Sequence, residues 1–485
     1  MRRGVFSTSP SLRPDRRRQK AGVFLKIIIV GSGKVGYTLA EQLVREKHDI
    51  TVLDRKEEAL KKVSDTLDLM TVRGSGVSVN CLREAGAETA DVLVAATDSD
   101  EINMVCCLMS KNVGTKYTIA RIRDPEYTDG LGSLQRDLGI DLIINPESAT
   151  AAEISRLLRF PAAANIDSFC RGRVELMGFR LQEGDFLVGK PLRELSDRVK
   201  KLSLLFCAAQ RDDGVIIPNG AFVPRAGDKL YLVGRPGSLD QFFRTLGRYT
   251  PKVSSVFIAG GGKISLYLAQ LLERTRVQVK ILERDADRCR LISEQLPRCM
   301  VIQGESSDQQ LLESERLSAS DAFVALTDRD EDNLIVSLYA LQQGVAKVIA
   351  KSNEQNYVGI AQSIGLDSVI SPKLITAQYI LQVVRGMQNS QGSVMNALYR
   401  IANGGAEAME FTVSPATRGL NTPLKNLHLR PGVLIAVIAR GDEIIIPEGS
   451  SRLQAGDSVI LISRNSGILD LNDIFTSIPT TGQEG

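Results

Sequence analysis

The chain has 485 residues, a length that favours about three or four domains over a single core. Its net charge is only +3, from 60 basic and 57 acidic residues, and much of the excess lies in the first twenty positions, so the near-neutral body argues against nucleic acid as the main partner. No apolar run approaches the ~18 residues that cross a bilayer, and seven scattered cysteines without a C-x-x-C pair indicate a reducing compartment rather than a zinc site or a disulfide framework.

The first 24 residues are rich in arginine, serine and proline and lack apolar periodicity, which predicts a disordered basic arm over 1–24. Such an arm is typical of an organelle transit peptide, but a start codon assigned too far upstream explains it as well. We favour the second explanation and expect the folded chain to begin near Leu25.

A strand, a glycine turn and a helix follow, in the stretch from Lys26 to Arg55. The β-branched run Ile27–Val30 enters the turn Gly31-x-Gly33-x-x-Gly36, and apolar residues one turn apart then predict a helix. A second apolar run ends in Asp54, about 20 residues further on, where a ribose-binding acid stands in dinucleotide-binding units. We therefore predict nucleotide binding by these residues: Gly31, Ser32, Gly33, Lys34, Val35, Gly36, Asp54 and Arg55.

Each glycine of the turn has a separate role in this interpretation. Gly31 makes the tight turn, Gly33 lets backbone amides approach a pyrophosphate, and Gly36 lets the helix pack close to the strand. The helix N-terminus then offers free N–H groups and the positive end of its dipole to the phosphates. The carboxylate of Asp54 would repel a 2′-phosphate, which predicts that NAD or adenine nucleotides bind and that NADP binds poorly.

Further candidate binding residues follow later strands of the same unit. Gly74-Ser75-Gly76 comes after the third strand, where it either approaches the ribose or adenine or forms a plain turn. Thr97 stands where the fourth strand, DVLVAAT, turns into a helix, so it caps that helix, faces the ligand crevice, or does both. Arg121 ends the next strand, where it either reaches a phosphate or is a solvated surface charge, and its cationic counterpart Lys351 favours the phosphate contact. The binding residues predicted here are Gly74, Thr97, Asp98, Asp100, Asn103 and Arg121.

Alternating apolar runs and helical segments predict a doubly wound, Rossmann-like α/β domain over residues 25–147. The stretch SATAAEISRLL then predicts a helix, and short strands with turn signals predict a small β-rich α+β domain over 165–249. Gly-Asp turns between apolar stretches such as KLYLVG indicate β-hairpins in that domain.

The second half of the chain repeats the first. Gly260 and Gly262 match Gly31 and Gly33 at one constant offset along the chain, and later pairs such as Thr97 and Thr327 keep this offset with a shift of one position. This register predicts a second α/β domain over 252–373, a helix from LITAQYILQVV, and a second β-rich domain over 393–478. The binding residues predicted in the second α/β domain are Gly260, Gly262, Glu283, Thr327, Asp330 and Lys351.

The second glycine turn departs from the pattern in one place that bears on binding. Ser265 stands where the third glycine is expected, and Glu305-Ser306 replaces Ser75-Gly76. Because a serine adds a side chain at a close helix–strand contact, the sequence leaves open whether the second unit binds a nucleotide.

The chain lacks the residues that would make the nucleotide a reagent. A dehydrogenase needs an acid–base group near the nicotinamide, but His48 precedes the second strand on the wrong side of the sheet and His428 lies in the last β-rich domain. No Walker lysine motif, G-x-S-x-G motif or metal-ligand constellation occurs. We therefore predict that the chain is not an enzyme and that the nucleotide is a signal.

The tandem glycine turns, the acids after the second strands, the T-x-x-D-x-x-N pattern and the stretch IIPNGAFVPRAGDKLYLVG resemble RCK domains, the regulators of potassium conductance. The N–C–N–C order from Leu25 to about Ile478 is similar to the TrkA family of Trk potassium-uptake regulatory proteins. This resemblance implies a cytoplasmic subunit, peripheral at the inner face of the plasma membrane, on a potassium-translocating membrane subunit. It also implies NAD(H) as the ligand, with ATP or ADP as further candidates, and a homo-oligomer, a tetramer, that couples ligand occupancy to the transporter.

Two other functions are compatible with these residues. An RCK-type regulator can serve another cation channel or antiporter, and co-purification with the membrane partner separates that function from a Trk subunit. A soluble NAD-dependent oxidoreductase shares the same fold, and sustained oxidation of NADH with a candidate substrate would indicate it.

Overall fold

The computed structural model describes residues 24–124, 127, 135–160, 163–195, 199, 201–212, 214–247, 252–366, 368–388, 393–464 and 467–476. The predicted basic arm therefore lies outside the described residues, apart from Phe24. Among the described residues, no helix combines the length and the apolar character that crossing a bilayer requires.

The first α/β unit (residues 24–144) contains a six-stranded parallel sheet in the order β3-β2-β1-β4-β5-β6. Its strands are β1 (Lys26–Val30), β2 (Asp49–Asp54), β3 (Met70–Arg73), β4 (Val92–Ala95), β5 (Tyr117–Arg121) and β6 (Leu142–Ile144). Its helices are α1 (Lys34–Arg45), α2 (Glu57–Ser64), α3 (Val79–Glu84) and α4 (Asp100–Val113). The sheet order reverses between β1 and β4, so the predicted doubly wound fold is confirmed and the crevice lies where the glycine turn was expected.

The second α/β unit (residues 252–370) has the same six-stranded order, β14-β13-β12-β15-β16-β17. Its strands are β12 (Ser255–Ala259), β13 (Gln278–Glu283), β14 (Met300–Gln303), β15 (Ala322–Ala325), β16 (Lys347–Lys351) and β17 (Val369–Ile370). Its helices are α10 (Lys263–Glu273), α11 (Ala286–Gln295), α12 (Gln309–Ser314), η4 (Leu317–Ala319), α13 (Asp330–Gln342) and α14 (Gln355–Ser363). The predicted duplication therefore extends to every strand of the sheet.

Two β modules follow the units, each with a five-stranded antiparallel sheet, in the orders β10-β9-β11-β8-β7 and β18-β19-β22-β20-β21. The first module (165–247) contains β7 (Asn165–Phe169), η2 (Cys170–Gly172), β8 (Val174–Arg180), η3 (Leu192–Glu194), β9 (Leu204–Arg211), β10 (Gly214–Ile216), β11 (Lys229–Gly234) and α9 (Pro236–Thr245). The second module (393–476) contains β18 (Val394–Ile401), η5 (Ala402–Gly404), β19 (Ala406–Thr412), η6 (Leu424–Asn426), β20 (Val433–Arg440), β21 (Glu443–Ile445), β22 (Ser458–Ser463) and η7 (Leu471–Ile474).

The Gly-Asp turns of the β modules do not join paired strands, unlike the predicted hairpins. The strand after Gly227-Asp228, β11, pairs with β8 and β9 rather than with the preceding β10. Asp228 instead accepts two hydrogen bonds from Arg211, at 2.8 and 2.7 Å. Asp457 accepts the matching pair from Arg440, both at 2.8 Å. The repeated arginine and aspartate therefore hold a long loop onto the sheet.

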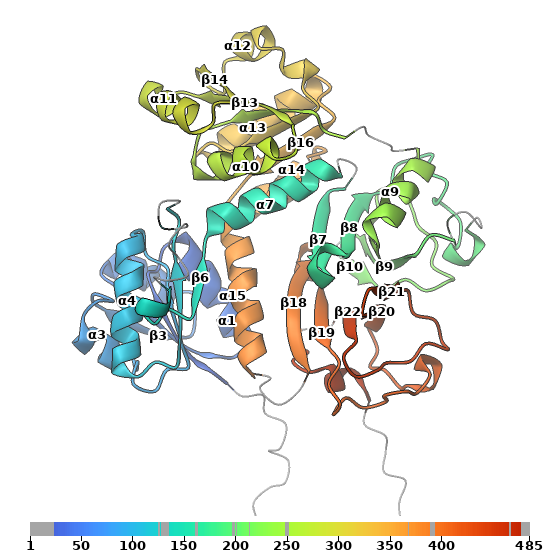
Figure 1. The fold of residues 1–485 in the computed structure, drawn as a ribbon, viewed down its shortest axis with the longest axis horizontal. Coiled ribbons are helices and arrows are strands. Elements are labelled where there is room, and N and C mark those ends of the chain that lie inside the picture. Colours follow the sequence, from blue (N-terminus) through green and yellow to red (C-terminus); the bar gives the residue numbers. More distant parts are fainter. Residues whose placement is uncertain are drawn as a thin grey trace, which may run out of the picture.

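A connector helix joins each unit to the following module, as the sequence predicts: α7 (Pro146–Arg159) and α15 (Pro372–Gln388). Asn145 begins α7 by accepting a hydrogen bond from the Ser148 N–H at 2.8 Å, and Pro146 fits the first helical turn. Each connector crosses to the other repeat, because α7 packs against α10 and α15 packs against α1 (Figure 1).

The hydrophobic cores follow this crossing rather than the chain order. Leu39 and Leu43 of α1 share one core with Ile380 and Val384 of α15 and with the second β module. The helix α10 shares another core with α7 and with the first β module. Each unit is thus covered by the connector and the module of the opposite repeat.

The two β modules also pack against each other, on the right of Figure 1. The Tyr399 hydroxyl donates to the Ser168 carbonyl at 2.9 Å, and the Ala402 N–H donates to the Tyr231 hydroxyl at 2.9 Å. These contacts join η5 and β18 of the second module to β7 and β11 of the first, which leaves the four domains in one connected assembly.

The crossed cores predict the behaviour of the first repeat alone. A chain of residues 24–249 lacks α15, so the apolar face of α1 loses its cover and stays in water. We expect this half-chain to dimerise or aggregate, which light scattering coupled to size exclusion would measure. A folded, monodisperse monomer of the half-chain would contradict the crossed cores.

Candidate functional site

The first glycine turn contains two glycines that the protein itself requires and one that it does not. Gly31 has φ +99°, and a Cβ there would lie 2.9 Å from the Ala96 carbonyl oxygen. A Cβ on Gly36 would lie only 1.9 Å from the Gly31 carbonyl oxygen. At Gly33, φ is −66°, and apart from residue 33 and its two neighbours in the chain, no atom of the described residues lies within 4 Å of a built Cβ. The chain alone therefore gives no reason for glycine at position 33.

The second turn has the same geometry in spite of Ser265. Gly260 has φ +102°, and no described atom lies within 4 Å of a Cβ built on Gly262. The Ser265 side chain is fully buried, and its hydroxyl donates a hydrogen bond to the Gly260 carbonyl. The serine thus points into the contact between helix and loop, not into the crevice.

The helices after both turns begin with backbone donors that no side chain caps. Gly33 and Gly262 are the N-cap residues of α1 and α10, and neither can cap with a side chain. Neither helix has an acidic residue in its first turn. The N–H groups and the positive dipole end are therefore available to meet an anion, and phosphate is the typical one.

The acid at the end of each second strand lies directly beside its turn. The carboxylate of Asp54 accepts hydrogen bonds from the N–H and hydroxyl of Ser32, both at 2.7 Å, and from the Lys56 N–H at 2.9 Å. Partial burial raises the pKa of Asp54, but the hydrogen bonds from Lys56 and Ser32 outweigh it and leave this pKa below its ordinary value of 3.8. The group stays charged at neutral pH, and its contribution to stability is lost only as the pH falls below that value. Glu283 makes the matching contact with the Gly261 N–H at 2.7 Å.

The glycine-rich loop after β3 lies next to this acid. The Gly74 N–H donates to the Asp54 carbonyl at 2.9 Å, and Arg55 donates to the Ser75 hydroxyl at 2.8 Å. A Cβ on Gly74 would lie 2.4 Å from the Cys81 sulfur, and one on Gly76 would lie 2.6 Å from the Cys106 sulfur. Close packing thus explains these two glycines, and the loop lies at the end of the crevice that Asp54 borders.

Thr97 and Asn103 form a clamp between neighbouring strands. The Asn103 side chain is fully buried and accepts hydrogen bonds from the Thr97 N–H at 2.8 Å and the Thr97 hydroxyl at 2.7 Å. It donates to the carbonyls of Thr97 and Arg121, at 3.3 and 2.8 Å. Asp100 adds a third connection, accepting from the backbone N–H groups after β5. These residues fix the carboxyl ends of β4 and β5, which form one wall of the crevice.

The N-cap of α4 is Ser99 and not Thr97. The Ser99 hydroxyl accepts from the Ile102 N–H at 3.1 Å, whereas the Thr97 hydroxyl is engaged by Asn103. The second unit repeats the clamp: Asn333 accepts from the Thr327 N–H and hydroxyl at 2.8 and 2.7 Å. Its amide donates to the Lys351 carbonyl at 3.1 Å.

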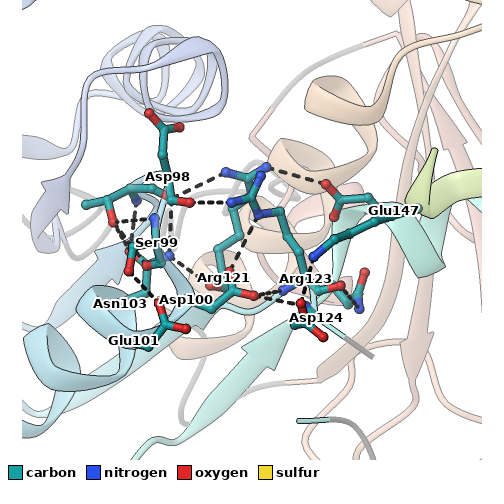
Figure 2. A network of polar contacts seen from close by, with 12 residues as sticks. Asp98, Ser99, Asp100, Glu101, Asn103, Arg121, Arg123, Asp124 and Glu147 are labelled. Atoms are coloured by element: carbon teal, nitrogen blue, oxygen red, sulfur yellow. Dashed lines mark hydrogen bonds and ion pairs between the residues drawn. The ribbon is translucent and has the colours of Figure 1, made fainter. Parts of the chain in front are cut away.

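Arg121 and Arg123 lie between Asp98 and the connector residue Glu147 (Figure 2). The Arg121 guanidinium is 3.6 Å from the Glu147 carboxylate, and Arg123 donates to the Asp98 carbonyl. Burial lowers the pKa of Arg121 and raises that of Glu147, and the attraction between them opposes both shifts. Within the described residues, Arg121 Nε and Glu147 Oε2 have no hydrogen-bond partner, so this pair is incompletely satisfied.

The edge of the first unit meets the glycine-turn helix of the second unit at this network. Lys263, the first residue of α10, lies 2.9 Å from the Asp124 carboxylate. The Tyr267 hydroxyl donates to the Arg123 carbonyl at 3.2 Å and accepts from Asn145 at 2.9 Å. The two crevices therefore open near the contact between the units.

Lys351 is the counterpart of Arg121 and is also buried. Burial lowers the pKa of Lys351, which Asp328 and Asp330 oppose. The charges of Lys34 and Glu147 also shift the pKa of Lys351. A lysine from each unit therefore lies near Glu147, at the start of α7.

The second unit has an open cleft at the predicted position, with about 610 Å³ of empty space that is partly continuous with solvent. Its lining includes predicted residues of the turn, the acid and the β15 end, and Ser265 is not among them. The lining residues are Gly260, Gly261, Gly262, Leu282, Glu283, Arg284, Arg288, Gly304, Glu305, Ser306, Leu326, Thr327, Asp328, Arg329 and Asp332. Asp330 instead accepts backbone hydrogen bonds after β16, from Asn353 at 2.6 Å and Glu354 at 3.1 Å.

Sequence reasoning missed several residues at or between the crevices. Lys263 could have been found, since it follows Gly262 as Lys34 follows Gly33. Glu147 could not, because its counterpart at the start of α15 is Lys373 and the repeat gives no matching charge. Arg288 and Arg329 of the second cleft likewise have no counterpart, as Ala59 and Ser99 stand at the matching positions.

Comparison with known proteins agrees with the duplicated architecture. The TrkA-N domain matches residues 27–146 and 256–372, and the TrkA-C domain matches 176–247 and 408–476. A Trk system potassium uptake protein TrkA homolog of Methanosarcina mazei is 32% identical over 461 residues, which cover 93% of this chain and 100% of that protein. This chain belongs to the TrkA family. The TrkA of Halomonas elongata is 34% identical over 442 residues, covering 90% of this chain and 95% of that protein.

Solved structures share the fold at lower identity. The GsuK RCK domain aligns with a TM-score of 0.60 at 19% identity and covers 95% of each chain. The GsuK channel bound to NAD aligns with a TM-score of 0.59 at 20% identity, covering 93% of this chain and 78% of that chain. The paired α/β units and β modules thus share the fold of the GsuK RCK domain.

The clamp at the crevice wall gives a stability prediction. Asn103→Ala leaves the buried Thr97 N–H and Arg121 carbonyl without partners, which we expect to cost on the order of 2–4 kcal/mol and to lower the melting temperature. Asn333→Ala should cost a similar amount in the second unit. The control Ser99→Ala removes the N-cap bond and an exposed hydrogen bond to Glu101, and should cost about 1 kcal/mol. Equal melting temperatures for Asn103→Ala and Ser99→Ala would argue against the clamp.

Proposed function

We propose that this chain is the cytoplasmic regulatory subunit of a Trk-type potassium-uptake system and that its α/β units bind NAD(H). Membership of the TrkA family supports the regulatory role in potassium transport. The alignment with a channel whose structure holds NAD supports the choice of ligand, and ATP or ADP would occupy the same crevice through their shared adenosine and phosphates.

One observation carries the ligand assignment: the glycines at 33 and 262. Their backbones are in ordinary negative-φ conformations, and among the described residues no neighbour would touch a side chain there. Glycine at such a position lets a ligand approach the backbone at the start of a helix. The same requirement in both units favours a phosphate-bearing ligand for each.

The remaining residues have distinct roles in this proposal. Asp54 and Glu283 would accept hydrogen bonds from the ribose hydroxyls, because carboxylate oxygens have lone pairs beyond those used by the turn. Gly74 and Arg55 would border the adenosine, while Thr97 and Asn103 hold the wall in place. Arg121 would form a charge-assisted hydrogen bond with a ligand phosphate. Its guanidinium is available for this because its ion pair with Glu147 is long, at 3.6 Å.

The position of the crevices favours a binding switch. Lys263 of the second turn contacts Asp124 at the edge of the first unit, and the charge of Lys34 in the first turn acts on Lys351 of the second unit. Each turn therefore begins its helix near a charged group of the other unit. A ligand shifts this contact only by its difference in affinity for the two arrangements of the units. The subunit would act from the inner face of the membrane, as a homo-oligomer bound to the potassium-translocating subunit. Among the described residues, no group of three or more histidine, cysteine, aspartate or glutamate side chains is arranged to hold a metal ion.

The required glycine can be tested directly in the full chain. Gly33→Val should abolish NAD binding to the first unit and leave the fold intact, because the side chain enters space that only the ligand uses. Titration calorimetry with NAD, NADH and ADP measures the loss, and NADP serves as the ligand that Asp54 should exclude. The matched change Gly262→Val should remove binding from the second unit only. Unchanged NAD affinity in the double variant would refute the assignment of the crevices.

The switch is tested at Arg121, whose guanidinium reaches the clamp only through a 3.4 Å hydrogen bond to the Thr97 carbonyl. Arg121→Gln should weaken nucleotide binding about tenfold or more and reduce regulated potassium uptake together, since a charge-assisted contact is worth roughly 1.5–3 kcal/mol. Uptake is measured in cells that lack their own copy of the gene. Removal of residues 1–24 is the control and should change neither quantity. Normal regulated uptake in a variant that no longer binds nucleotide would reduce the nucleotide to a structural ligand.

A further inference from the structure

A buried ion cluster joins three parts of the molecule that are far apart in sequence. Arg385 of α15 has no exposed surface and donates two hydrogen bonds to each of two carboxylates. The distances are 3.0 and 2.6 Å to Glu46, and 3.0 and 2.9 Å to Glu407. Arg400 adds a contact to Glu46 at 3.2 Å, so two arginines balance two glutamates.

The cluster lies at the opposite end of α1 from the phosphate site. Glu46 is the residue directly after this helix, whose N-cap is Gly33. Glu407 belongs to β19 and Arg400 to β18, both in the second β module. A 12-residue helix, roughly 18 Å long, therefore connects the first crevice to the sheet of that module. Two hydrogen bonds from one guanidinium to one carboxylate fix the distance and the orientation between the elements that carry them. The apolar contacts between α1 and α15 are less directional and allow the helices to shift along each other.

The helix after the second glycine turn, α10, lacks the connection that Glu46 gives α1. Arg159 of α7 is the counterpart of Arg385, because the two arginines occupy the same position relative to the prolines that begin their helices, Pro146 and Pro372. Arg159 pairs with Glu175, the counterpart of Glu407, at 3.5 Å, but its side chain is 58% exposed. At the offset that relates the two glycine turns, the counterpart of Glu46 is Thr275, which has no charge to offer. Within the described residues, α10 is thus attached to α7 and the first β module without a matching ion pair.

We propose that Glu46 and Arg385 are positioning residues that transmit occupancy of the first crevice, and not of the second, to the second β module. The inference rests on nucleotide binding at the first crevice, as proposed above. A phosphate at Gly33 attracts the positively polarised N-terminus of α1, and the helix shifts toward it as a rigid body. Glu46 at the other end of the helix shifts with it. Through the ion pairs, Glu46 then displaces Arg385 and β19. Separating the ions instead would leave buried charges without partners, which is the more costly response.

The test is Glu46→Thr in the full-length protein, which copies the second repeat and leaves Arg385 paired with Glu407. Hydrogen exchange of residues 394–412 is measured with and without saturating NAD, and NAD affinity is measured by calorimetry. In the unmodified protein we expect NAD to slow exchange in this segment about fivefold or more, a typical size for coupling between sites. In Glu46→Thr we expect NAD affinity within about twofold of the unmodified protein and no NAD-dependent change in the segment.

Two further variants make the result specific. Glu46→Gln keeps the shape of the side chain and should lose most of the response, which covers the case in which the threonine variant folds poorly. Arg159→Gln, in the equivalent pair of the first repeat, should leave the response of residues 394–412 unchanged. A response that persists in both Glu46 variants, or an unmodified protein that binds NAD without any response in this segment, overturns the inference alone. Absence of NAD binding to the unmodified protein overturns the proposed function, and this inference with it.

Discussion

Each connector helix packs against the glycine-turn helix of the opposite repeat, and the rest of the structure depends on this exchange. The apolar faces of α1 and α10 are too large to leave in water, and the exchange covers each with a helix that arrives later or earlier in the chain. As a result the two units cannot be separated without exposing both cores. The exchange also turns the carboxyl edge of the first sheet toward α10, which brings Lys263 to Asp124 and the crevices to the contact between the units.

Duplication supplied the scaffold, and substitutions then made its two halves unequal. The backbone clamp of Asn103 recurs at Asn333 with nearly the same distances, since it holds the sheet and not a particular ligand. Charged groups at the borders have diverged: Glu147 corresponds to Lys373, and Glu46 to Thr275. The common part of each unit therefore builds a crevice, while the differing part determines what the crevice is connected to.

Much of this architecture could be predicted from the sequence, because it follows from local patterns repeated at a fixed spacing. The parallel sheets, the glycine turns and both connector helices were predicted and are confirmed. The acids lie at the predicted ends of the second strands, beside the turns, and their binding of a ribose stays a prediction. The crossing of the connectors could not be predicted, since periodicity shows that α7 has an apolar face but not which helix covers it. For the same reason Arg385, a charged residue in an apolar helix, gave no signal: its two carboxylate partners lie 339 and 22 residues away.

The sequence was least informative about polar side chains that have more than one possible hydrogen-bond partner. Thr97 was expected to cap α4, to face the ligand crevice, or to do both. Ser99 forms the cap instead, and the Thr97 hydroxyl binds Asn103, while its contact with a ligand stays a prediction. Ser265 left open whether the second unit binds a nucleotide, and its hydroxyl donates a hydrogen bond to a carbonyl of the turn. In both cases a hydrogen bond between segments decides the role, and such bonds have no signature in spacing or hydropathy.

The crossed cores also determine when the protein can finish folding. α1 is complete at Arg45, but the helix that covers it begins at Pro372. At about 5–20 residues per second, synthesis of the intervening chain takes roughly 15 to 65 seconds. The face of Leu39 and Leu43 is without its partner throughout that time. Two nascent chains on one messenger can meanwhile cover each other's helices, so pairing between copies competes with completion of a single chain.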